Sequence, residues 1–159
     1  MRFLRPRTEK SAAPLLVFQI TRHEKAALLA TLQHFPVLEA AHHRLTKTGT
    51  AAGAAEQRLL EEAMAQRQFE HKRKLDEFFR APEQFFRNDR DELHLTLTAA
   101  QLEWLLQVLN DIRVGSWVQL GCPELDYARL PELAREKPAA FTAMETSGIF
   151  QSVLLEAFA

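Results

Sequence analysis

The sequence predicts a mainly α-helical protein, a helical bundle with a small two-stranded β-sheet as a minor α+β component. Long stretches carry apolar residues at helical spacing, which is typical of amphipathic helices packed on a core. Two of these stretches begin with a capping box, Thr21–Glu24 and Thr98–Gln101. Each capping box directly follows a short run of alternating apolar residues, and such alternation predicts a strand.

The size and composition of the chain indicate one domain. It has 159 residues, 47% of them hydrophobic, which is enough for a packed core. We expect a single helical domain over residues 14–159, preceded by a flexible basic arm over residues 1–13. The formal net charge of -1 produces no overall field that favours nucleic acid or an anionic membrane. The single cysteine, Cys122, forms no internal disulfide, and no apolar run reaches the ~20 residues of a membrane span, so we expect a cytoplasmic protein without membrane contact.

The first half of the chain predicts one strand and two helices. Residues 15–20 are expected to form the strand, and a helix should follow over about residues 22–44. Pro36 should kink or split this helix, because proline lacks an N–H and clashes with the preceding turn. A second, long helix is expected over about residues 54–80. Its middle, residues 66–74, is almost wholly polar, which indicates a solvated helix or one that bridges to a partner.

The second half repeats the order of strand, threonine cap and helix. Leu93–Leu97 alternates apolar and polar residues, and the helix after Thr98 should reach about Leu120, where glycine and proline follow. A last helix is expected after Pro138. Two short strands are unstable alone, so we expect residues 15–20 and 93–97 to pair and to place both following helices on one face.

The segment Leu109-Asn-Asp-Ile-Arg113, followed by Leu120-Gly121, resembles the most characteristic stretch of a bacterial family, domain-of-unknown-function family two thousand and seventeen. The order of the predicted elements is also similar, although the middle helix is longer and more charged than the family pattern. The family has no established activity, so the resemblance implies no catalytic residues. It implies a gene neighbourhood shared with an adaptor for an ATP-dependent protease, and therefore a role near protein quality control.

Arg113 is the most informative polar residue. On a helical wheel of ~100° per residue it falls about 40° from the apolar stripe centred on Leu109. Burying an unpaired cation is costly, so we expect an ion pair with Glu145 on the last helix. An anion or carboxylate site at Arg113 is the alternative, because its guanidinium offers a planar fork of donors. Asn110 lies at the border of the stripe, and Asp111 is expected to be exposed and available to a partner.

The sequence Phe78-Phe79-Arg80 recurs seven residues later as Phe85-Phe86-Arg87. Large apolar residues usually lie in the core. Four rings around a helix break also suit a partner-binding patch, and Phe85 and Phe86 are the candidates for it.

A protein-binding adaptor or regulator without catalytic residues, linked to proteolysis by the resemblance, is the function that these features favour. A second copy of the chain is a further candidate partner. The alternative is a nucleic-acid-associated protein that uses the basic arm and the run His71–Lys74, although acidic residues around the run can neutralise it. The six histidines have no metal-ligand spacing, so no metal and no cofactor are expected, and whether the chain is an enzyme stays open.

Overall fold

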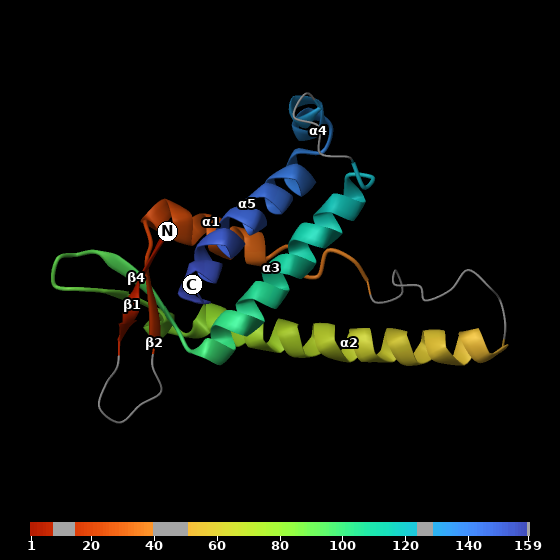
Figure 1. Ribbon diagram of the computed structural model, residues 1–159, viewed down its shortest axis with the longest axis horizontal. Helices are drawn as coiled ribbons and strands as arrows, with labels where there is room; N and C mark the ends of the chain where they lie inside the picture. The colour runs from red at the N-terminus through yellow and green to blue at the C-terminus, as the bar shows by residue number, and fades with distance from the viewer. Residues whose placement is uncertain (8–14, 40–50, 124–128, 159) are drawn as a thin grey trace.

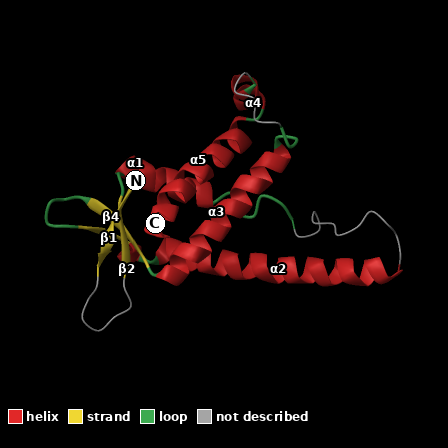
Figure 2. Cartoon of the chain, in the orientation of Figure 1, coloured by secondary structure: helices red, strands yellow, loops and turns green. Residues whose placement is uncertain are grey.

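The structure is a computed structural model of the chain and describes residues 1–7, 15–39, 51–123 and 129–158 (Figure 1). Its elements are β1 (Arg2–Arg7), β2 (Leu15–Gln19), α1 (Arg22–Leu32), α2 (Ala51–Arg80), the 3-10 turn η2 (Pro82–Gln84), β3 (Phe85–Arg87), β4 (Leu93–Leu97), α3 (Ala99–Gln119), α4 (Leu130–Glu136), α5 (Pro138–Leu155) and the 3-10 turn η3 (Glu156–Phe158). Figure 2 shows the sheet at one end of the molecule and most of the helical part beside it.

The mostly helical prediction is confirmed, but the predicted two-stranded sheet is wrong. The sheet has four antiparallel strands in the order β1-β2-β4-β3. Its two central strands are the predicted pair, with Leu16 opposite Leu97 and Phe18 opposite Leu95. Both capping boxes are also confirmed at the starts of α1 and α3.

The two edge strands were not predicted because neither has a strand pattern of its own. β1 lies within the segment expected to be a flexible arm, and it contains three arginines and a proline. β3 has only three residues and comes from the Phe-Phe-Arg repeat. Each strand forms by pairing its backbone with an edge of the central pair, an interaction that depends little on side-chain pattern. The rest of the expected arm, residues 8–14, lies outside the described residues.

The core forms between one face of the sheet and the helices. Phe3, Phe18, Leu95 and Phe85 lie in register across the four strands. Phe18 and Leu95 are completely buried, and they join a cluster that contains much of α3 and part of α5. The pair α3 and α5 packs together more extensively than any other pair of helices, which makes α3 the central helix of the protein.

The helix predicted over residues 22–44 ends at Leu32, ahead of Pro36. This early end agrees with the steric restriction that proline places on the preceding residue, which disfavours helical backbone there. Residues 40–44 of that prediction lie outside the described residues. No helix in the described part of the chain is long and apolar enough to cross a membrane.

Helix α2 has 30 residues and projects beyond the rest of the described chain (Figure 1). At 1.5 Å per residue it is about 45 Å long. Its C-terminal part lies against the body, where His71, Leu75 and Phe78 are buried. Leu59 and Phe69 face away and are 67% and 66% exposed. The helix is therefore attached to the body mainly through its second half.

Candidate functional site

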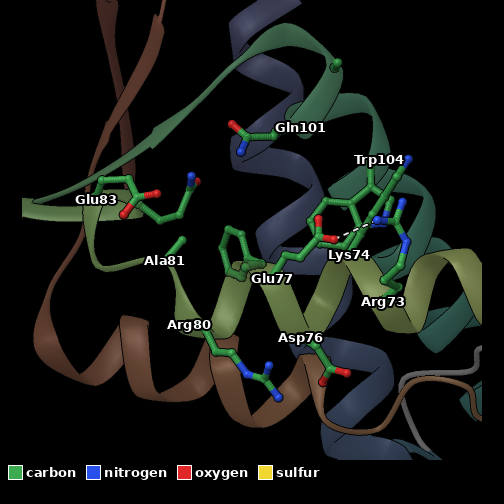
Figure 3. A pocket seen from close by; sticks show the side chains of 12 residues that line it. Arg73, Lys74, Asp76, Glu77, Arg80, Ala81, Glu83, Gln101 and Trp104 are labelled. Atoms are coloured by element: carbon green, nitrogen blue, oxygen red, sulfur yellow. Dashed lines mark hydrogen bonds and ion pairs between the residues drawn. The ribbon is translucent and has the colours of Figure 1, made fainter.

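A groove of about 780 Å³ lies between the C-terminal end of α2, the turn η2 and the first turns of α3 (Figure 3). The buried rings of Phe78 and Trp104 form part of its lining, and their centroids are 5.9 Å apart. Lys74 and Glu83 lie on its rim and are exposed to solvent. The groove thus combines an apolar lining with a charged rim.

The local sequence explains why the chain leaves this space open. Helix α2 ends at Arg80, because Pro82 cannot continue a helix and instead begins η2. The chain then returns through β3 and β4, and Thr98 caps the start of α3 beside the end of α2. Ala81 and Ala100 line the groove with small side chains, so little fills the gap between the two helix ends.

Two buried polar atoms in the groove lining have no hydrogen-bond partner among the described residues. They are Nε1 of Trp104 and Oε1 of Gln84. The two side chains are only 6% and 9% exposed. Leaving a buried donor or acceptor unpaired costs about 1–3 kcal/mol, and both atoms lie beneath the surface of the groove.

Three cations and three carboxylates line the groove: Arg73, Lys74, Arg80, Asp76, Glu77 and Glu83. Figure 3 shows Arg73, Lys74 and Trp104 at one end and Glu83 at the other. Arg73 donates to Glu77 at 2.8 Å, and this exposed ion pair neutralises both charges. Lys74 forms no ion pair with any described carboxylate, and Asp76 forms none with any described cation, so the formal charges of the lining side chains balance.

Arg113 does not form the predicted ion pair. It is exposed, and its Nη1 donates to Oε1 of Gln151 at 3.3 Å, whereas Glu145 is exposed and unpaired with it. The side chain of Arg113 lies near Gly148, where an added Cβ would be 3.9 Å from its Cδ. A long side chain at the edge of an apolar stripe can extend its charged end to solvent, and this removes the need for a buried partner.

Asp111 is half-buried rather than exposed, because it binds α2. Both of its carboxylate oxygens accept from Nη2 of Arg67, at 3.0 and 3.1 Å. Asn110 is exposed, and both residues line a small cavity of about 90 Å³ that also contains Gln68. The structure thus brings Asn110 and Asp111 together with α2, while Arg113 lies apart from them.

His71, one helical turn after Arg67, is buried against the ring of Phe35 with the centroids 5.6 Å apart. Its Nδ1 has no hydrogen-bond partner among the described residues. Burial lowers the pKa of His71 below the ordinary histidine value, and the charge of Arg67 lowers it further, whereas Asp111 acts in the opposite direction. Lys74 and Glu70 have smaller, opposing effects on the same group.

Acidification is therefore expected to weaken the fold through His71. The unfolded chain takes up this proton more readily than the folded one, so the contribution of the neutral ring is fully present above pH 6.5. It is lost as the pH falls through the lower folded-state value. Chemical unfolding between about pH 5 and pH 8 measures the effect. The free energy of unfolding should depend less on pH in His71→Gln than in the unsubstituted protein, and the control His23→Gln should keep the original dependence. An equal dependence on pH in all three proteins would contradict the expectation.

The Phe85–Phe86 pair does not form a single patch, because successive residues of a strand point to opposite faces. Phe85 faces the core, 5.9 Å from Phe78, and Nζ of Lys25 lies 4.2 Å from its ring centroid. Phe86 lies on the other face and stacks on His94 at 5.1 Å. Both rings are half-buried.

The basic run His71–Lys74 does not form one surface either. His71 is buried, Arg73 pairs with Glu77, and Lys72 does not line the groove that Lys74 borders. In the described part of the chain no group of three or more potential ligands is arranged for a metal ion. His42 and His43 lie outside the described residues.

Comparisons with family models, with curated proteins and with solved structures find no match for this chain. The groove beside α2 was also missed by sequence reasoning, although two signals for it were present. The Ala81-Pro82 break stands between the two Phe-Phe-Arg segments, and Trp104 follows the second capping box by one turn. Only the pairing of β3 with β4 brings these segments together.

Proposed function

We propose that the protein is a cytoplasmic bacterial adaptor or regulator that holds a segment of a partner protein in the groove between α2 and α3. The observation that supports this most is the combination of the buried rings of Phe78 and Trp104 with a charged rim in one open groove. A peptide segment supplies apolar side chains that can pack on these rings and polar groups that can contact the charged rim. The proposal assigns no catalytic step and no cofactor to the chain.

The link to proteolysis comes from the resemblance of Leu109–Arg113 to the bacterial family. This segment lies in α3, whose first turns border the groove. In this proposal α3 provides the wall of the groove, and α2 projects beside it as a platform for the partner. An adaptor of this kind would present a bound protein to a protease without changing it chemically.

The nucleic-acid alternative receives less support from the geometry. Binding to phosphates requires several cations on one surface, and the run at residues 71–74 is divided between a buried ring, an ion pair and two separate exposed lysines. Nuclease treatment and salt dependence distinguish the two functions, since phosphate contacts weaken steeply with ionic strength.

A photo-crosslinking residue tests the proposal directly. At Glu83, on the groove rim, it should capture a protein from native lysate after nuclease treatment. At the exposed Glu132 of α4 it should not capture the same protein. Capture at both positions, or only before nuclease treatment, would contradict binding in the groove.

Reversing the charge of Lys74 should reduce this capture by about tenfold, which corresponds to about 1.4 kcal/mol of binding free energy. The matched control is Lys72→Glu, because Lys72 is also exposed on α2 but does not line the groove. The crosslinked yield at Glu83 is the measurement for both variants. An equal reduction in the two variants would indicate a general charge effect and would count against the groove.

A further inference from the structure

We propose that helix α2 binds the α2 of a second copy of this chain in an antiparallel pair, with the two-fold axis beside residue 64. The contact uses the face of α2 that carries Leu59 and Phe69, and neither residue lines the groove. The inference therefore does not depend on the proposed function.

Two large apolar side chains of α2 point to solvent. Leu59 and Phe69 are 67% and 66% exposed. On a helical wheel of ~100° per residue they lie about 80° apart. Each is also at least about 100° from the residues that attach α2 to the body, His71, Leu75 and Phe78. Figure 1 shows the first half of α2 extending beyond the other described helices, which leaves this face open to a second molecule.

The exposed stripe of α2 matches its own reverse. It consists of Leu59, Glu62, Gln66 and Phe69, which are all exposed and follow one another at spacings of three, four and three residues. This spacing keeps them on one side of a helix. Because the spacing is the same when read backwards, two antiparallel copies place Leu59 of one chain level with Phe69 of the other. They also place Glu62 level with Gln66, whose amide can donate to the carboxylate.

The charges of α2 favour the antiparallel direction. Residues 54–66 contain three glutamates and one arginine, a formal charge of -2. Residues 67–80 contain five cations and three carboxylates, a formal charge of +2, and Asp111 of α3 lowers this to +1 by pairing with Arg67. An antiparallel pair places each acidic half against a basic half, whereas a parallel pair would place like halves together. Charges beside the seam of a helix pair set its direction in this way.

Apolar burial and charge have different roles in this contact. Exposed ion pairs contribute little binding free energy, so the affinity comes mainly from burying Leu59 and Phe69 on both chains. A symmetric pair is also the commonest arrangement of two identical chains, because one surface serves both of them. The dimer carries two copies of the groove, one on each chain.

Sedimentation equilibrium of the purified chain tests the pairing. It should give the mass of two chains at high protein concentration and the mass of one chain at low concentration. Leu59→Gln combined with Phe69→Gln should weaken dimerisation by at least about tenfold, a change in the dissociation constant. The matched control is Ile149→Gln combined with Leu155→Gln, because these side chains are 62% and 53% exposed on α5.

The direction and register of the pair are tested by crosslinking in a Cys122→Ser background, since the natural cysteine is exposed. Chains with Leu59→Cys are mixed with chains with Phe69→Cys and treated with a short bismaleimide linker. The mixed crosslink should exceed either self-crosslink, because in the antiparallel pair two copies of residue 59 lie about 15 Å apart along the helix axis. A parallel pair would give the self-crosslinks instead.

The charge argument has its own matched pair. Glu56→Lys combined with Glu62→Lys makes both halves of α2 basic and should weaken dimerisation by about tenfold. Glu132→Lys combined with Glu136→Lys changes the net charge equally on exposed positions of α4 and should leave dimerisation unchanged. Equal weakening by the two variants would contradict the complementary halves.

A single-chain mass at every concentration up to about 1 mM, the weak end of the affinity scale, would overturn the dimer. Equal weakening by the glutamine variants of α2 and α5 would overturn the assigned face, and a predominance of self-crosslinks would overturn the antiparallel direction. The pairing joins chains that are already folded, so it adds to the free energy of unfolding only where the dimer is populated. Unfolding measured on the monomer should therefore not depend on this contact.

Discussion

Replacing Phe18 by alanine is expected to lower the free energy of unfolding by about 3–5 kcal/mol, the usual cost of deleting a fully buried aromatic side chain. Phe18 is completely buried in the central strand β2. Its ring lies 5.2 Å from that of Phe3, and its backbone position is opposite Leu95 of β4. The substitution therefore removes contacts to β1, to β4 and to the helices at the same time.

Chemical unfolding of the purified variant measures this loss. Phe69→Ala is the matched control, because Phe69 is 66% exposed on the projecting helix α2. Its effect should stay within about 0.5 kcal/mol, as expected for a surface position. A similar loss for the two variants would mean that the ring of Phe18 is not the centre of the packing between the sheet and the helices.

The second expected effect concerns Gly115 in α3. A Cβ at this position would lie 2.6 Å from the Cβ of Val37, in the segment that follows α1. Gly115→Ala should therefore destabilise the fold by about 1–3 kcal/mol through overpacking. This loss is expected although alanine is favoured over glycine by about 1 kcal/mol inside a helix. The clash is between two Cβ atoms, whose positions are fixed by the backbone, so a change of side-chain rotamer does not relieve it.

Gly148→Ala in α5 is the control, and its expected effect on the free energy of unfolding has the opposite sign. The nearest atom to a Cβ at this position is Cδ of Arg113 at 3.9 Å, which is ordinary contact. Gly148→Ala should stabilise the protein by about 0.5–1 kcal/mol, because alanine loses less conformational entropy on forming a helix. Thermal or chemical unfolding of both variants decides the matter, and stabilisation by Gly115→Ala would show that residues 35–38 do not pack tightly on α3.

The sequence signals that were reliable are those that act over a few residues. The capping boxes at Thr21 and Thr98 formed as predicted, because a hydroxyl and a side chain three residues later satisfy nearby backbone N–H groups. The alternating runs around Phe18 and Leu95 became the paired central strands. Helix α3 is central because its apolar residues lie on more than one side, a pattern visible in the sequence itself.

The edge strands show where such local signals end. β1 and β3 owe their conformation to backbone pairing with β2 and β4, and their side chains do not specify it. The same limit applied to Phe85 and Phe86. Adjacent rings can form one patch when they lie on a loop. On the strand β3, however, Phe85 faces the core and Phe86 faces outward.

The environments of the candidate site residues were hard to predict because the sequence does not show how the helices are oriented relative to one another. The helical wheel placed Arg113 near the edge of an apolar stripe, but it contained no information on whether the side chain could reach solvent. Asp111 was expected to be exposed, but it binds Arg67, which lies 44 residues earlier in the chain. That distance is bridged only when α2 crosses α3. No pattern within α3 predicts the crossing.

By itself, the sequence determined the main helices, their caps and the two central strands, because these depend on interactions between residues a few positions apart. The tertiary structure alone decided the four-stranded sheet, the pairing of Arg67 with Asp111 and the groove beside Trp104. Each of these joins segments that are distant in sequence, and their geometry is set by how whole elements pack. The groove exists because the turn after Arg80 and the cap at Thr98 bring two helix ends together, with the small side chains of Ala81 and Ala100 in its lining.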